Sequence, residues 1–302
     1  MGLPELLVAS GAYRDLEAPV VVTSGEFLTP FFVNAERLCG DAEIDAVLAA
    51  HGHDDGELVR YACSRADADP RFREAVGLLA AAVRRLPSMR SGVVVSGGQR
   101  RDWLFSGPVA RELGVPHLAL YKQEPGGGPE RDRLVLRDAR GTVTAAPALR
   151  GLTAVHVVDM ITAASSCVSR DPITGREVGW VPMLRSRGAR IADLVAVVSR
   201  RQGGEEALAR AGVAVTALAV VDEAFLAERS RSPAEAVAYY RGPEEWTRRW
   251  LAEHGVDVLA SYFVEDPKKL PRLRKFLGTY RPFLEARGLW ADVDAMARAR
   301  LG

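Results

Sequence analysis

One short segment constrains the fold of this chain more than any other. Residues 155–158 are rich in valine, follow a turn at Gly151, and end at Asp159. A strand of this composition is typical of a parallel sheet that is covered by helices on both faces. Because ligands of such sheets bind beyond the carboxyl ends of the strands, we expect the chemistry of the protein to lie at Asp159 and in the loop behind it.

The loop that follows Asp159 has the composition of an anion-binding segment. Its five residues are small, and three of them carry hydroxyl groups. The backbone N–H groups of such a loop can surround an anion at the start of a helix. The sequence therefore predicts a phosphate cradle with a carboxylate beside it. The residues of this cradle are Thr162, Ala163, Ala164, Ser165 and Ser166.

Further apolar segments repeat the pattern of a buried strand followed by a polar turn or a helix. The first contains the glycine pair Gly97 and Gly98 before a helical segment, which is the context of anion-binding loops. Strands that alternate with helices predict an α/β fold with a doubly wound, mostly parallel sheet. The segments are residues 92–103, residues 116–121, which end before Lys122, and residues 191–199, which end before Arg200.

The charge balance argues against several functional classes. With 40 Lys and Arg against 39 Asp and Glu, the chain has no overall basic field that would indicate binding to nucleic acid or to a membrane. The N-terminal residues lack a basic and apolar leader, and no apolar run approaches the ~18 residues of a membrane span. Three distant cysteines indicate free thiols. We expect a cytoplasmic protein.

Taken in order, these segments resemble the type I phosphoribosyltransferases, and the orotate phosphoribosyltransferases in particular. Residues 157–166 are similar to the family's phosphoribosyl-pyrophosphate signature, in which two consecutive acids hold the ribose hydroxyls and the next loop binds the 5′-phosphate. Only the second acid is kept, as Asp159, and Val158 stands in the place of the first. Ala164 stands where glycine is usual, and Ser165 where threonine is usual.

The resemblance also assigns residues to pyrophosphate. The glycine turn is similar to the family's pyrophosphate loop, and residues 122–124 parallel its Arg-Lys-Glu. Residues 125–133 stand in the place of the mobile catalytic loop, but they contain neither lysine nor histidine, so Arg131 becomes its candidate catalytic cation. The implied pyrophosphate contacts are Gly97, Gly98, Gln99, Arg100 and Lys122.

On the base side the resemblance is weaker. Residues 24–34 are similar to the hood over the base, and Phe31 and Phe32 are either walls of a base pocket or ordinary core aromatics. Thr23 replaces the family's base-binding lysine. Arg200 is similar to the arginine that binds the base's carboxylate, although Ser199 replaces the acid before it.

The resemblance ends near residue 230. We expect a phosphoribosyltransferase-like domain over residues 1–230, with a hood segment over residues 1–40, and a C-terminal helical extension over residues 231–302 that caps the site or forms an oligomer interface. Residues 170–179 form a turn-rich insertion close to the phosphate loop.

The resemblance implies a homodimeric, Mg²⁺-dependent enzyme that transfers the phosphoribosyl group of phosphoribosyl pyrophosphate to a small base. In that scheme Lys122 and Arg100 offset the charge of the leaving pyrophosphate, and Asp159 holds a ribose hydroxyl and meets the metal only indirectly. Two alternatives remain open: a regulatory protein that binds the same ligand without turnover, and an enzyme that uses the cradle for another sugar phosphate.

Overall fold

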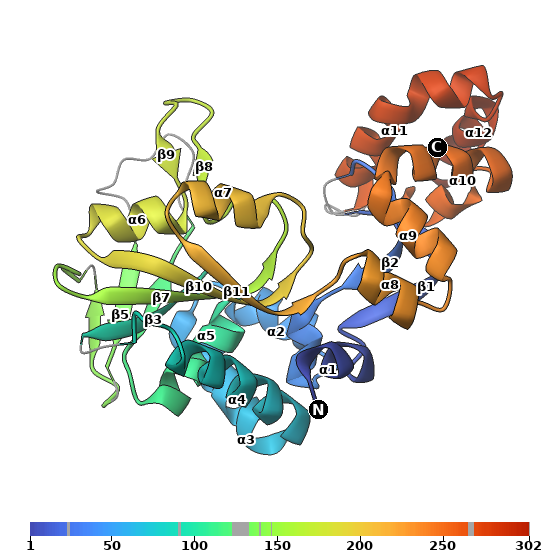
Figure 1. Ribbon diagram of the computed structural model, residues 1–302. Coiled ribbons are helices and arrows are strands. Elements are labelled where there is room, and N and C mark those ends of the chain that lie inside the picture. Colours follow the sequence, from blue (N-terminus) through green and yellow to red (C-terminus); the bar gives the residue numbers. More distant parts are fainter. Residues whose placement is uncertain are drawn as a thin grey trace. The chain divides into compact units, whose positions relative to one another are not determined.

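The computed structural model divides the chain into two compact units (Figure 1). The first unit contains residues 1–12 and 34–221, and the second contains residues 13–33 and 222–302. The structure describes residues 1–22, 25–89, 92–122, 133–138, 140–145, 147–264 and 269–301.

The first unit is built on a seven-stranded sheet of order β11-β10-β7-β3-β4-β5-β6. Its first five strands pair in parallel, and the last two pair antiparallel at the edge. The central strands are buried along most of their length, which explains their valine-rich sequences. The strands are β3 (Val93–Gly98), β4 (His117–Leu120), β5 (Leu134–Arg137), β6 (Val143–Ala145), β7 (Thr153–Ile161), β10 (Arg190–Ser199) and β11 (Ala214–Val220).

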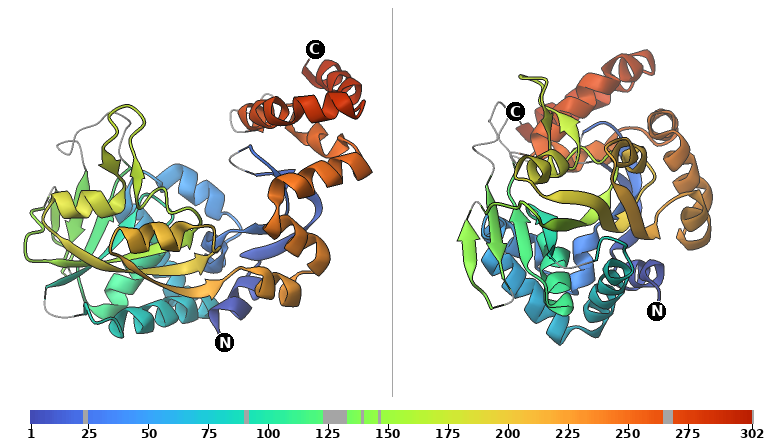
Figure 2. Two further views of the ribbon diagram at one scale, coloured as in Figure 1. Left: turned by 45° about the horizontal axis from the view of Figure 1, so that its top comes forward. Right: turned by 60° about the vertical axis from the view of Figure 1, so that its left-hand side comes forward.

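Helices cover both faces of this sheet (Figures 1 and 2), so the predicted doubly wound α/β fold is confirmed. α1, α4 and α5 pack on one face, with α3 behind them, and α6 and α7 pack on the other. The helices are α1 (Leu3–Ala9), α2 (Ile44–His51), α3 (Asp55–Ala68), α4 (Pro70–Arg84), α5 (Trp103–Leu113), α6 (Trp180–Ser186) and α7 (Gly204–Arg210), with a 3-10 turn η1 (Ala35–Cys39).

The insertion that the sequence predicts after the phosphate loop is a small β-hairpin. Its strands are β8 (Ser169–Arg170) and β9 (Glu177–Val178), which pair antiparallel. The turn between them is closed by Asp171, whose carboxylate accepts the N–H groups of Ile173 and Thr174, both at 2.8 Å. A side chain that binds the backbone ahead of it in this way is a common device for closing turns.

The second unit combines an antiparallel hairpin with helices. The hairpin strands β1 and β2 pack against α9, α10, α11 and η3. Thr247 on α10 accepts the N–H of Leu28 at 3.1 Å, and the hydroxyl of Tyr262 accepts the N–H of Val21 at 2.9 Å. The elements are β1 (Tyr13–Val21), β2 (Leu28–Val33), α8 (Glu223–Arg229), α9 (Pro233–Arg241), α10 (Pro243–His254), η3 (Asp257–Tyr262), α11 (Lys269–Ala286) and α12 (Trp290–Leu301).

The structure groups the hairpin differently from the domain boundaries that the sequence suggests. The hood segment was expected to belong with residues 1–230, but residues 13–33 pack with residues 222–302. Two contacts show why: the rings of Tyr13 and Phe225 meet edge to face at 5.0 Å, and Asp15 accepts a hydrogen bond from the Ser230 hydroxyl at 2.7 Å. Among the described residues, no helix is long and apolar enough to cross a membrane.

Candidate functional site

The glycine pair at the end of β3, where the turn begins, is shaped by close packing. A Cβ atom on Gly97 would clash with the hydroxyl of Ser106, and one on Gly98 would clash with the ring of Trp180. Glycine is required at both positions because no side chain fits. The turn that the sequence assigns to pyrophosphate therefore lies directly against Trp180, the first residue of α6.

Asp102 ties this turn to the end of β7. Its carboxyl oxygens accept the N–H of Gly98 and the N–H of Asp159, each at 3.0 Å. Asp102 is buried, with 8% of its surface exposed. Asp102 is not among the site residues predicted from the sequence, although an acid at the start of the helix after a glycine turn is a signal of such a hydrogen bond to the backbone. Asp102 thus fixes the position of Asp159 relative to the turn.

Asp102 and Asp159 interact electrostatically. Burial and the neighbouring charge of Asp159 raise the pKa of Asp102 well above its usual value. Burial also raises the pKa of Asp159, and the guanidinium of Arg101 opposes this increase. Arg101 in turn contacts the carboxylate of Glu36, which is only 2% exposed, at 3.1 Å. Asp159 therefore lies in a polar cluster that sequence reasoning did not find.

Two side chains of the turn are already engaged with the α2–α3 region. The guanidinium of Arg100 donates to the carbonyl of Leu48 at 3.0 Å. The side-chain amide of Gln99 donates to the carbonyl of Gly52 at 3.0 Å, and its oxygen accepts the backbone N–H of Lys122 at 3.1 Å. Gln99 therefore links the turn to the end of β4, while its side chain already has protein partners.

The loop after β7 has the backbone of an anion cradle. Ala164, at the position where the family has glycine, adopts φ +54°. Alanine pays a small steric cost there. The loop is held by Ala164, whose carbonyl accepts the N–H groups of Cys167 and Val168, and by Thr162, whose carbonyl accepts the N–H of Gly204, all at 2.9 Å.

The amides of this loop remain available for a ligand. Within the part of the chain that the structure describes, the N–H groups of residues 163–166 have no hydrogen-bond acceptor. A run of successive amides without protein acceptors suits an anion. The side chains of Ser165 and Ser166 are exposed beside these amides.

A cavity of about 330 Å³ brings predicted residues together. Lys122, from the end of β4, lines the same cavity as Ser165 and Ser166, from the loop after β7. Trp180 and Gly179 complete part of its wall, and neither was predicted as a site residue. The cavity therefore presents a lysine and two hydroxyls at the carboxyl ends of parallel strands, where ligands of this sheet type bind.

The remaining predicted residues lie elsewhere or outside the described part. Arg200 follows β10, is half-buried, and donates its backbone N–H to the carbonyl of Ile161 at 2.9 Å. Phe31 belongs to the second unit, where its ring packs 5.5 Å from that of Tyr239. Phe32 is partly exposed in the same strand. Arg131 lies outside the described residues, so its role stays a prediction.

Comparisons with known proteins give matches among solved structures only. No family model matches the chain, and no curated protein matches it. The orotate phosphoribosyltransferase of Aeropyrum pernix is similar at 20% identity, with 75% of this chain and 97% of that chain covered and a TM-score of 0.47. The UMP synthase of Leishmania donovani is similar at 15% identity, with 91% of this chain and 41% of that chain covered and a TM-score of 0.42.

A third similar structure is the Mycobacterium tuberculosis orotate phosphoribosyltransferase. It shares 15% identity over 72% of this chain and 96% of that chain, with a TM-score of 0.40. Two of the three proteins carry the name of the enzyme that the sequence motifs resemble. Because these identities and TM-scores are low, we take the function from the residues of this chain.

Proposed function

We propose that the first unit binds phosphoribosyl pyrophosphate and transfers its phosphoribosyl group to a nitrogenous base, releasing pyrophosphate. One observation carries this proposal: the amides of residues 163–166, which have no acceptor within the described residues, lie in a loop whose serines share a cavity with Lys122. The loop amides can bind one phosphate group, and the nearby ammonium group of Lys122 can bind another. This arrangement suits a substrate that carries a phosphate group at each end.

In this proposal the chain positions the substrate and offsets its charge. The loop amides and the hydroxyls of Ser165 and Ser166 bind the 5′-phosphate, and Asp159 accepts a hydrogen bond from a ribose hydroxyl. The bond between C1 and the pyrophosphate oxygen breaks, the pyrophosphate leaves with the electron pair, and the base nitrogen forms the new bond to C1. Lys122 stabilises the negative charge that develops on the leaving group.

Magnesium fits this site only together with the substrate. Within the described ranges no three His, Cys, Asp or Glu side chains are grouped so that they can hold a metal ion. Mg²⁺ in phosphate-transfer sites is commonly held by one or two carboxylates and by the phosphates of the substrate. Asp159 would contribute indirectly, by holding the ribose hydroxyls. The ion would neutralise charge on the pyrophosphate.

An orotate-like pyrimidine is the acceptor that we propose, supported by Arg200 at the end of β10. A second candidate function is a regulatory protein that binds the same ligand without turnover. It is favoured by Val158, which replaces an acid of the family and is 3% exposed within the apolar core of the sheet. This side chain cannot replace the ribose contacts of a carboxylate.

Calorimetric titration with phosphoribosyl pyrophosphate and Mg²⁺ tests the proposal, using Ser165→Asp as the main variant. The new carboxylate repels the 5′-phosphate, so we expect binding to weaken by at least tenfold. Ser64→Asp, on the exposed surface of α3, adds the same charge and should bind like the wild type.

Release of pyrophosphate with a panel of bases then separates the two functions. Turnover with any base supports the transferase, and tight binding without turnover supports the regulatory protein. Equal affinity of the wild type and Ser165→Asp would show that the phosphate site is not in this loop.

A further inference from the structure

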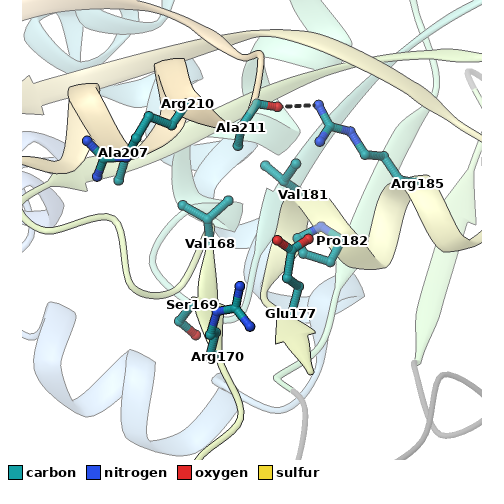
Figure 3. Close-up of a pocket in the computed structure, with 10 residues that line it drawn as sticks. All are labelled: Val168, Ser169, Arg170, Glu177, Val181, Pro182, Arg185, Ala207, Arg210 and Ala211. Carbon is teal, nitrogen blue, oxygen red and sulfur yellow. Dashed lines mark hydrogen bonds between the residues drawn. The ribbon is translucent and has the colours of Figure 1, made fainter. Parts of the chain in front are cut away.

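A second and larger cavity is lined by residues of the β8–β9 hairpin and of two helices (Figure 3). It has a volume of about 610 Å³ and lies between the β8–β9 hairpin, α6 and α7. Val168, Val181 and Pro182 form part of an apolar surface, and the lining also contains four charged side chains. The combination of an apolar surface with a few charged groups is typical of small-molecule sites.

The charges of this cavity are unbalanced. It is lined by Arg170, Arg185 and Arg210 against a single acid, Glu177, so that three positive charges minus one negative charge leave +2. The described part of the chain forms no ion pair with any of the four. The protein as a whole carries only +1. The positive charge of the lining is therefore only partly balanced by Glu177.

The arginines keep most of their donors for a ligand. Arg185 donates to the carbonyl of Ala211 at 2.6 Å, and Arg170 donates to that of Gly175 at 3.3 Å. Each guanidinium has five N–H groups, so one hydrogen bond leaves several of them available. Guanidinium groups bind phosphates and carboxylates through paired hydrogen bonds. The chemistry of the lining thus selects small anions.

The hairpin is a wall shared by the two cavities. Ser169 lines both cavities, and its cross-strand partner Val178 lines the cavity of the phosphate loop. The next cross-strand pair, Arg170 and Glu177, lines only the larger cavity, which we call the arginine cavity. Successive residues of a strand point to opposite faces, which explains why Val178 and Glu177 line different cavities. α6 is also joined to the loop, because Trp180 donates its N–H to the carbonyl of Ser166 at 3.0 Å.

We propose that the arginine cavity is a regulatory site for a small dianion, either a phosphate ester or a dicarboxylate, and that its occupation weakens anion binding at the phosphate loop. The reason for the sign is electrostatic: two anions in neighbouring cavities that share Ser169 in their linings repel each other. The coupling is reciprocal, so an anion in the loop weakens binding in the arginine cavity by the same factor. The site requires only anion binding by the loop and does not depend on transferase activity.

Titration with inorganic phosphate and with succinate tests the site. We expect the wild type to bind phosphate at two sites and succinate at one. In the double variant Arg170→Gln/Arg210→Gln, the affinity for succinate should fall at least tenfold. The affinity of one of the two phosphate sites should fall by the same factor. Arg85→Gln with Arg190→Gln removes the same charge from exposed positions of the same unit and should bind like the wild type.

The Ser165→Asp variant separates this inference from the proposed function. It should lose only the other phosphate site and keep succinate binding. Saturating succinate should weaken the remaining phosphate binding of the wild type about fivefold or more. Unchanged succinate binding in the double variant, or an equal loss in its control, would refute the arginine site. Binding of both ligands without mutual effect would refute the coupling alone, and neither result would bear on phosphoribosyl transfer.

Discussion

At the scale of single residues, the site depends on a carboxyl group that touches no proposed ligand. Asp102 joins the turn after β3 to the end of β7 through two backbone N–H groups. The family holds its ribose acid beside a second acid in the same strand, and this chain has Val158 there instead. Asp102, at the N-cap position of α5, places a second carboxyl group beside Asp159 from outside β7. We therefore regard it as a positioning residue for Asp159.

Replacing Asp102 by asparagine should lower both stability and ligand affinity. Asparagine has one acceptor oxygen, so one of the two N–H groups loses its partner in a buried setting, at a cost of about 1–3 kcal/mol in the free energy of unfolding. Urea unfolding measures this cost, and calorimetry measures the affinity for phosphoribosyl pyrophosphate.

Asp138→Asn is the matched control for Asp102→Asn. Asp138 also accepts two backbone N–H groups, from Arg140 and Thr142, but through one oxygen in a surface turn. Asparagine can keep both of those bonds, so the control should stay within about 0.5 kcal/mol of the wild type. An equally small effect for Asp102→Asn would show that the tie between the two strands is dispensable.

At the scale of elements, the strands were predictable and the polar contacts between them were not. The valine-rich segments predicted β3, β7 and β10, because a short run of apolar β-branched residues indicates a buried strand from local composition alone. These strands are indeed buried. Lys122 and Ser165 line the same cavity. This could be predicted, because the carboxyl ends of parallel strands lie at the same edge of the sheet. The attachment of Arg100 to Leu48 on α2 could not be predicted, since it depends on how a distant helix packs.

The buried histidines of the sheet should make stability fall in mild acid. Burial lowers the pKa of His117 to about 4 and that of His156 to about 3, so both stay neutral in the folded protein. The unfolded chain takes up protons below the ordinary pKa near 6.5, and this stabilises the unfolded state as the pH falls. Protonation of His117 in the unfolded chain should by itself lower the free energy of unfolding by roughly 2.5 kcal/mol between pH 7 and pH 4.5.

Urea unfolding between pH 7 and pH 4.5 measures this loss. His117→Gln removes the titrating group and should show a shallower fall than the wild type. The raised pKa of Asp102 acts in the opposite direction, but it is common to both proteins and cancels in their difference. His51→Gln, at an exposed position, is the control and should follow the wild type. Parallel curves for His117→Gln and the wild type would contradict the expectation.

At the scale of the whole molecule, each unit has its own core. Phe31 lies in the aromatic core of the second unit, with its ring 5.7 Å from that of Tyr13 and 5.5 Å from that of Tyr239. The sequence left open whether this residue lines a base pocket or fills a core, because the partners of the ring are far away in the chain. Its contacts are those of a core residue, and a role toward the base stays a prediction.

Phe31→Ala should destabilise the second unit without changing anion binding by the first. Loss of a buried phenylalanine costs about 3–5 kcal/mol, measured by urea unfolding. Phe283→Ala, at a partly exposed position of α11, should cost much less. Inorganic phosphate should bind to both variants as to the wild type. Loss of phosphate binding in Phe31→Ala alone would show that the first unit depends on this aromatic core.

The division of the second unit into two segments has a consequence for synthesis on the ribosome. Residues 13–33 emerge early, but residues 222–302, against which they pack, emerge only after all of residues 34–221. At about 5–20 residues per second, the hairpin waits on the order of ten seconds or longer with its apolar side chains uncovered. The first unit can complete its sheet during that interval. The order of translation thus separates the folding of the two units in time, because the second unit can form only after its C-terminal segment has been made.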